Sequence, residues 1–281
     1  MKVLCRQLAV WLLTVVFTVA GGAMAFASPF IFSGTDSDDH GFALGGANQD
    51  GWLFMQKSLE NLAPAVTNGN KVVTILGSTS SALTAASSAF NLSGLVGAGW
   101  TLQTVSTANF ATFFGVGGGL ANAGILMMDS GTNVGGGIDG SAFVPYASTI
   151  NTFVGSGGGL FSQGNGYDWV TALLPSLTVT DVGGGGIGSA LSLTAAGNAA
   201  FPGLTNGDLS TGPWHNYFTG TGALPILATA PDFAGATRNV IIGSSSGSIT
   251  DPGTPRVPEP ASLLLLGAGL AGLAFSKRVK A

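Results

Sequence analysis

The densest group of side chains able to bind a ligand is the acidic stretch DSDDHG, which contains Asp36, Asp38, Asp39 and His40. Aspartates at its first and third positions and a glycine at its sixth match the start of a calcium-binding loop. The match is incomplete, because His40 stands at the fifth position and Ala47 at the twelfth, where such loops place a bidentate glutamate. Two interpretations stay open, a calcium-stabilised binding module and a solvated acidic loop.

A second group of residues has the chemistry of a serine hydrolase, which needs a nucleophile, a base and an acid. Ser162 lies in LFSQG, which has the last glycine of a nucleophile elbow but carries Leu160 in place of the first. His215, one of only two histidines, would be the base, with Asp168 or one of two later aspartates as the acid. Its surroundings, GPWHNYF, are more typical of a packed or hydrogen-bonded histidine than of a catalytic one. No residue stands out as catalytic, and the candidates are Ser162, His215 and Asp168.

Aromatic side chains offer flat surfaces on which neutral sugar rings could stack, with amide neighbours such as Asn216 to bind hydroxyl groups. Packing in the hydrophobic core is the alternative, because aromatic residues dominate the energetics of protein cores. The side chains concerned are Trp52, Trp100, Trp169, Trp214 and Tyr217.

These residues can act only in the compartment to which the chain is sent, and the N-terminus indicates export. Residues 1–27 begin with Lys2 and Arg6, continue with an apolar run and end in small-x-small cleavage sites, the pattern of a secretory signal peptide. Signal peptidase is therefore an expected partner. The only cysteine, Cys5, lies in this segment, so the exported chain would contain no thiol.

The C-terminal segment, residues 256–281, reads RVPEPASLLLLGAGLAGLAFSKRVKA. Pro258, Glu259 and Pro260 precede an uncharged apolar run, and Lys277 and Arg278 follow it. As a helix, this run would span about 22 Å at 1.5 Å per residue, which is shorter than the ~30 Å hydrocarbon core of a membrane. The segment therefore predicts a short transmembrane helix that anchors the chain only transiently.

The order of these parts resembles the PEP-CTERM sorting signal of Gram-negative bacteria. The resemblance implies that an exosortase processes the chain near Pro258, Glu259 and Pro260, before the helix and the basic end at Lys277 and Arg278. It also implies a bacterium that exports exopolysaccharide. The expected location is transient anchoring in the membrane, then the cell surface or the extracellular matrix.

Between the two ends, residues 28–242 are expected to form one exported domain, and residues 243–255 (rich in Gly, Ser and Pro) a flexible linker. From Ser28 to Pro255 the chain has three Lys or Arg residues against twelve Asp or Glu residues, a formal charge of −9. Nucleic acid is therefore excluded as a partner, because phosphate binding needs a basic surface.

Apolar runs and helix-period segments alternate along the domain, which favours an α/β fold with a mostly parallel, flavodoxin-like sheet and flanking helices. A Gly-rich all-β fold is the alternative, given 46 glycines. Asp50 and Ser141 are the expected caps of the first and fourth helices. The predicted strands are 29–33, 71–76, 100–105, 124–128, 158–161, 176–180 and 239–242, and the predicted helices 51–62, 81–90, 108–114, 141–154 and 167–174.

The domain also resembles the class I glutamine-amidotransferase-like group, which has flavodoxin-like sheets. The resemblance lies in KVVTILG, GILMMDSG, INTFV and GSGGGLFSQGNGYDWV. Active members carry a cysteine at the strand-to-helix elbow, where this chain has Ser162 and Gln163, so the resemblance implies the fold without amidotransferase activity.

The sequence thus predicts an exported envelope or extracellular protein that binds a matrix component, exopolysaccharide among them, without catalysing a reaction. A degenerate serine hydrolase and a calcium-stabilised binding module are the alternatives, and no cofactor other than calcium is expected.

Overall fold

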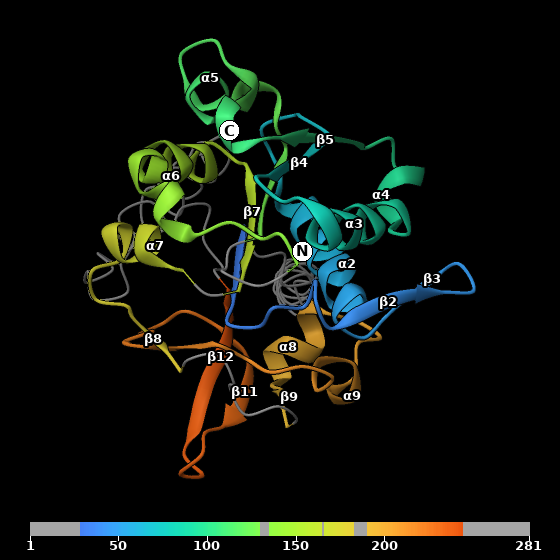
Figure 1. Ribbon diagram of the computed structural model, residues 1–281, viewed down its shortest axis with the longest axis vertical. Coiled ribbons are helices and arrows are strands. Elements are labelled where there is room, and N and C mark those ends of the chain that lie inside the picture. The colour runs from blue at the N-terminus through green and yellow to red at the C-terminus, as the bar shows by residue number, and fades with distance from the viewer. Residues whose placement is uncertain (1–28, 130–134, 165, 183–189, 244–281) are drawn as a thin grey trace, which may run out of the picture.

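The computed structural model describes residues 29–129, 135–164, 166–182 and 190–243 of the chain (Figure 1). The predicted signal peptide, the sorting signal with its short transmembrane helix, and the linker beyond residue 243 lie outside these described residues. Within them, no helix has the length and apolar character needed to cross a membrane.

A mixed sheet of ten described strands runs through the domain, and five neighbouring strands in it form a parallel core. Each corresponds to a predicted strand, and the sheet with its flanking helices confirms the α/β fold and excludes the all-β alternative. In spatial order the five strands are β5 (Thr101–Val105), β4 (Val72–Leu76), β6 (Ile125–Asp129), β7 (Gly159–Gln163) and β1 (Phe30–Ser33).

Beyond β1 the sheet continues with antiparallel strands, most of which the sequence did not predict. Only β8 (Thr178–Asp181) and β12 (Thr237–Gly243) correspond to predicted runs. The other three strands are short or interrupted by Pro and Gly, so their period-2 pattern is weak. They are β9 (Ser192–Leu193), β10 (Asn216–Thr219) and β11 (Ile226–Pro231).

Helices cover both faces of the sheet, because side chains of successive strand residues point to opposite sides. In β1, Ile31 faces one core cluster, whereas Phe30 and Phe32 face the other. The Ile31 face is covered by α2 (Asp50–Leu62), α3 (Ser80–Asn91), α4 (Gly94–Gly97), α8 (Ala195–Ala200) and α9 (Asn206–Leu209). The other face is covered by α5 (Phe110–Phe114), α6 (Ala147–Gly155) and α7 (Asp168–Leu173).

Two helix starts differ from the prediction. Asp50 does not cap α2 but is its first residue, with φ +54°, and no side chain caps the helix. The predicted helix from Ser141 divides into a 3-10 segment that contains Pro145 and then α6, and its cap is Asp139, which accepts from the Ser141 N–H at 2.7 Å. The described 3-10 segments are Ala63–Ala65, Thr107–Asn109, Gly119–Asn122 and Gly140–Tyr146.

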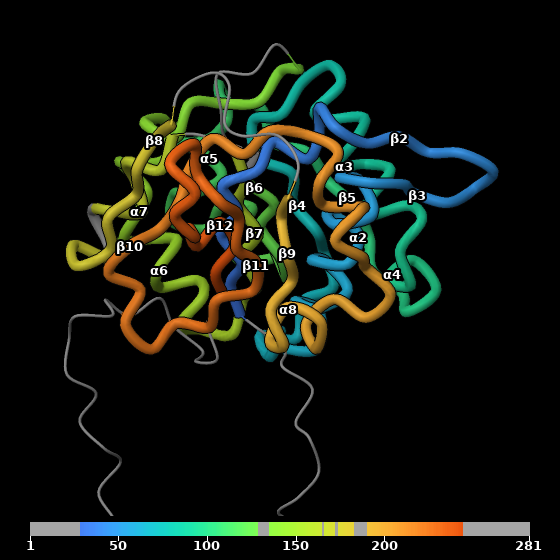
Figure 2. The backbone as a smooth tube through the Cα atoms, turned by 90° about the horizontal axis from the view of Figure 1, so that it is seen from below, coloured from blue at the N-terminus to red at the C-terminus, as the bar shows by residue number. Residues whose placement is uncertain are grey.

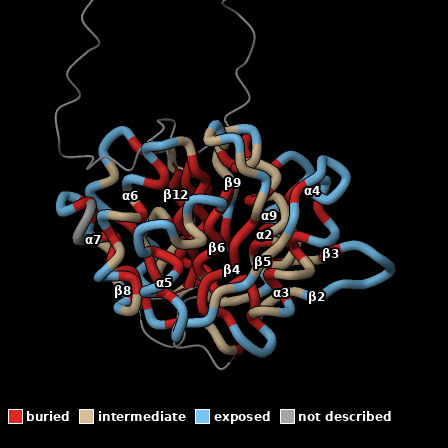
Figure 3. The backbone as a smooth tube through the Cα atoms, turned by 90° about the horizontal axis from the view of Figure 1, so that it is seen from above, coloured by how far each residue is buried: buried red, intermediate tan, exposed pale blue. Residues whose placement is uncertain are grey.

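A hairpin of β2 (Gly41–Leu44) and β3 (Ala47–Gln49) projects from the domain, in a segment for which the sequence predicted no strand (Figures 1 and 2). Gly45 and Gly46 form its tip with φ +62° and +83°, the left-handed conformation that two-residue hairpin turns require. Figure 3 shows the hairpin as exposed, in contrast to the buried central strands. The pattern was missed because the strands bury little of their length against the core.

Candidate functional site

The carboxyl ends of the neighbouring parallel strands β1 and β7 are joined by the side chain of Tyr167, which follows β7. Its hydroxyl accepts from the Ser33 N–H at 3.0 Å. The single hydroxyl proton is shared between two carbonyl oxygens, Ser33 O at 2.6 Å and Ser162 O at 2.9 Å. The Gly164 N–H donates to Thr35 O at 2.6 Å. Carboxyl ends of parallel strands are where open α/β sheets bind ligands, and these bonds hold that edge in one arrangement.

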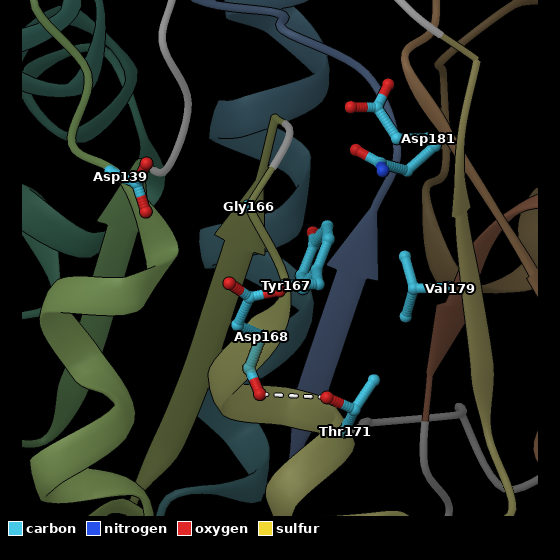
Figure 4. A pocket seen from close by; sticks show the side chains of 8 residues that line it. Asp139, Gly166, Tyr167, Asp168, Thr171, Val179 and Asp181 are labelled. Atoms are coloured by element: carbon cyan, nitrogen blue, oxygen red, sulfur yellow. Dashed lines mark hydrogen bonds between the residues drawn. The ribbon is translucent and has the colours of Figure 1, made fainter.

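A pocket of about 280 Å³ opens beside Tyr167 at this edge. In Figure 4, Tyr167 lies between Asp139 on one side of the pocket and Val179 and Asp181 on the other, with Asp168 below. The residues that line it are Asp139, Gly166, Tyr167, Asp168, Thr171, Val179, Asp181 and Asn216. They come from the ends of β7 and β8, the starts of α7 and β10, and the segment before Gly140.

Three aspartates make the pocket strongly acidic. Asp139, Asp168 and Asp181 are all exposed residues of its lining, and no Lys, Arg or His residue is among the lining residues. Hydrogen bonds from Ser141, first from its side chain and then from its N–H, hold the pKa of the Asp139 carboxyl below its usual value. Near neutral pH the pocket therefore presents negative charge and hydrogen-bond acceptors to a ligand.

Asn216 supplies a buried acceptor to the same pocket. The residue is 2% exposed, and Oδ1 has no hydrogen-bond partner among the described residues. The backbone of Asn216 is held against β1, because its N–H donates to Gly34 O at 3.2 Å. Gly34 permits this approach, since a Cβ at that position would lie 1.8 Å from Asn216 O. A buried unpaired amide oxygen costs free energy unless a ligand or water supplies a donor.

The next residue, His215, belongs to a separate cluster in which both histidines of the chain meet Asp36. His215 Nε2 lies 2.8 Å from Asp36 Oδ2, and His40 Nε2 lies 3.4 Å from the same oxygen. Burial of Asp36 opposes its ionisation, but hydrogen bonds from His215 and His40 outweigh it and lower the Asp36 pKa to about 2. The hydrogen bond with Asp36 raises the pKa of His40, against the opposing effect of burial.

Asp38 and Asp39, the other two aspartates predicted as metal ligands, lie in different surroundings from Asp36. Asp38 accepts from Gln163 Nε2 at 3.1 Å, which ties the acidic loop to the end of β7. Burial, followed by the charge of Asp36, raises the pKa of Asp39. The described part of the chain contains no group of three or more His, Cys, Asp or Glu side chains placed to hold a metal ion. The loop from Asp36 to His40 thus forms a network of internal contacts.

The three hydrolase candidates do not meet in a hydrogen-bonded triad. Ser162 is fully buried within β7, and its Oγ has no hydrogen-bond partner among the described residues. His215 pairs with Asp36, which the sequence did not propose as its acid. Asp168 lines the acidic pocket instead. A nucleophile needs a base within hydrogen-bond reach, so this arrangement does not support a triad of these residues.

The proposed aromatic surface is also absent among the described residues. Trp169 and Trp214 are at most 1% exposed, and Trp100 is 9% exposed. Tyr217 is covered by the Arg238 guanidinium, 4.6 Å from the centre of its ring. These side chains pack in the core or against neighbours, as the alternative interpretation expected.

Of the polar residues that line the pocket, the sequence indicated Asp168 and Asp181 as possible acids of a triad and Asn216 as a sugar contact, whereas Asp139 was missed. The signal for Asp139 was its position after the predicted strand at 124–128, where ligand-binding loops of α/β sheets lie. This signal was weak, because Asp139 lies about ten residues beyond the strand and follows a Gly-rich segment.

Comparison with protein families identifies the PEP-CTERM protein-sorting motif at residues 256–278. The chain therefore carries a PEP-CTERM sorting signal, which implies export, sorting to the cell surface and recognition by an exosortase. Neither the curated proteins nor the solved structures contain a match to the chain. The resemblance to the glutamine-amidotransferase-like group is accordingly not confirmed.

Proposed function

We propose that the exported domain is a non-enzymatic binding protein of the cell envelope whose acidic pocket holds a polysaccharide of the extracellular matrix. The sorting signal supports the location, because it directs the chain to the cell surface. The ligand class is supported by the pocket, because carboxylates and an amide oxygen accept hydrogen bonds from the hydroxyl groups of a sugar.

The observation that carries the proposal is the combination of Asn216 with the carboxylates of the pocket. Asp139, Asp168 and Asp181 are exposed residues of the lining, and Asn216, which also lines the pocket, has a buried Oδ1 without a hydrogen-bond partner among the described residues. Ligand sites typically combine a preformed concavity with a few placed polar groups. Tyr167 and Val179 add apolar surface between those groups, against which the C–H face of a sugar ring can pack.

Binding is favoured over hydrolysis because a nucleophile and a base do not come together. Ser162 Oγ lies in the buried interior of β7, and His215 is engaged with Asp36. The pocket itself contains neither Ser162 nor His215. A binding role requires only the placed acceptors that the pocket has.

The proposal is tested by electrophoresis of the exported protein through gels that contain purified exopolysaccharide of the producing bacterium. We expect the polysaccharide to retard the native protein and to retard Asn216→Ala much less. Asn151→Ala is the matched control, because Asn151 Oδ1 is also buried, has no hydrogen-bond partner in the described part of the chain, and does not line the pocket. Migration of the native protein that does not depend on polysaccharide concentration would overturn the proposed function.

A further inference from the structure

Strand β5 forms a free edge of the sheet, because it pairs with β4 on one side and with no described strand on the other (Figure 1). Two bonds at its ends fix the direction of its backbone groups. The Thr101 N–H donates to Lys71 O at 2.9 Å, and Val105 O accepts from the Gly77 N–H at 2.8 Å. Because successive residues of a strand alternate in the side to which their N–H and C=O groups point, those of Leu102 and Thr104 point away from β4. The described residues supply them with no partner.

This edge lacks the features that usually protect the edge of a sheet, which are charged side chains, Pro or a β-bulge. β5 reads TLQTV, and its five residues pair with β4 in an unbroken register. Thr101 and Thr104 are exposed. At the other end of the strand order, by contrast, β8 carries the charged residue Asp181. The β5 edge is therefore open to pairing with a further strand.

The chain around β5 is uncharged over a long stretch. Between Lys71 and Asp129 the sequence contains no Asp, Glu, Lys, Arg or His, and this stretch includes β4, α3, α4, β5 and α5. The formal charge of −9 over residues 28–255 therefore arises outside it. Two copies of so acidic a domain repel each other through their charged surfaces, and they meet with least repulsion at this end. Helix α4, which precedes β5 in the chain, exposes Val96 and adds apolar surface.

We propose that β5 pairs with β5 of a second copy of this chain, in antiparallel orientation about a two-fold axis at Gln103. In this register Leu102 of each copy lies opposite Thr104 of the other, and each of these two pairs exchanges two N–H···O bonds. All the outward-pointing N–H and C=O groups of Leu102 and Thr104 are then used. Such a contact is self-complementary, and two-fold dimers are the commonest protein oligomers. The inference is independent of the proposed polysaccharide binding.

The first test is the molar mass of the exported protein, measured by light scattering during gel filtration at increasing loading concentration. An edge-to-edge contact is small, so we expect monomer and dimer in equilibrium, with a mass that rises toward twice that of one chain. Thr104→Pro removes an outward N–H, and Thr104→Lys adds charge to the edge, so both should keep the mass of one chain. Thr178→Lys is the control and should associate as the native protein does, because Thr178 is an exposed residue of β8 at the other end of the strand order.

Cysteine substitution tests the register itself, because the only native cysteine, Cys5, lies in the predicted signal peptide. Gln103 would lie opposite Gln103 of the second copy as a non-hydrogen-bonded pair, with Cα atoms about 4.5 Å apart, which is within the range of a disulfide. Gln103→Cys should therefore form a disulfide-linked dimer under mild oxidation. Thr101→Cys is the matched control and should not, because the two copies of Thr101 would lie about 14 Å apart along the strand pair.

Three results would overturn the inference. A native protein with the mass of one chain at every concentration would leave the β5 edge to a strand of a different protein. A dimer that persists in Thr104→Lys would assign the association to another surface. Linkage of Thr101→Cys as efficient as that of Gln103→Cys would contradict the two-fold register. A cooperative melting transition establishes that each variant is folded, and if Thr104→Pro lacks one, Thr104→Lys decides the first test.

Discussion

His215 and Asp36, which lie far apart in the sequence, form the tightest charged contact of the histidine cluster, with Nε2 2.8 Å from Oδ2. Asp36 follows β1 and His215 precedes β10, so their contact joins the parallel core to the antiparallel half of the sheet. Both side chains are largely buried, at 13% and 8% exposure. Removing one partner of a buried charged pair leaves the other charge buried without compensation, which costs free energy of folding. The stability of the domain should therefore be sensitive to substitution of either residue.

The first prediction is that His215→Ala lowers the free energy of unfolding by about 3 kcal/mol, because Asp36 is left buried with only His40 beside it. In a double-mutant cycle with Asp36→Asn, the two losses should not add, since the residues contact each other. Urea denaturation measures both values. The control is Lys57→Met, which removes the partly exposed ion pair with Glu60 and should cost less than about 1 kcal/mol. Additive losses at Asp36 and His215 would show that their contact contributes nothing.

The second prediction is that stability depends on pH in two directions around Asp36. The Asp36 pKa falls from 3.8 to about 2 on folding, so its contribution, roughly 2 kcal/mol, is present above pH 3.8 and is lost as pH falls through 2. The His40 pKa is raised above 6.5, so its contribution is present below pH 6.5 and is lost as pH rises through the raised value. The neighbouring Asp39 has a raised pKa, which opposes the Asp36 effect at intermediate pH.

Thermal melts across this pH range check the prediction. The native protein should have its highest melting temperature between about pH 4 and pH 6.5. His40→Gln should flatten the decline above pH 6.5 and leave the acid limb in place, because Asp36 keeps its contact with His215. If the melting temperature of His40→Gln declines above pH 6.5 as steeply as that of the native protein, the decline is due to another titrating group.

The cluster also shows how far the sequence could predict this domain. The parallel strands were predictable, because Val72–Leu76 and Ile125–Asp129 are mainly apolar short runs, which are typical of strands in a sheet buried on both faces. The pairing of His215 with Asp36 was not, because it depends on where β10 lies relative to β1, and that position is set by contacts distant in sequence. The need for glycine at position 34 was not predictable for the same reason, because it arises from the close approach of the Asn216 backbone, which is distant in sequence.

The third prediction separates Ser162 from a catalytic role. Its Oγ is buried and has no hydrogen-bond partner within the described ranges, so Ser162→Ala should leave stability unchanged or raise it by about 1 kcal/mol. Polysaccharide binding should be unaltered. Ser33→Ala is the matched control, because the equally buried Ser33 hydroxyl lies 2.7 Å from Thr35 Oγ1 and accepts from Thr35 N–H. That variant should lose about 1 kcal/mol. A Ser162→Ala protein that loses binding would restore Ser162 as a functional residue.

The fourth prediction concerns the contact that places Asn216 in the pocket. A Cβ on Gly34 would lie 1.8 Å from Asn216 O, and the neighbouring backbone on both sides is hydrogen-bonded. Gly34→Ala must therefore push β10 away from β1, which we expect to cost about 3 kcal/mol and to weaken saccharide binding through displacement of Asn216. Gly94→Ala is the control, because a Cβ there meets no atom within 4 Å and should leave stability unchanged or slightly raised. Melting temperatures and titrations on both variants measure the difference. If Gly34→Ala binds as well as the native protein, the position of Asn216 does not determine the affinity of the pocket.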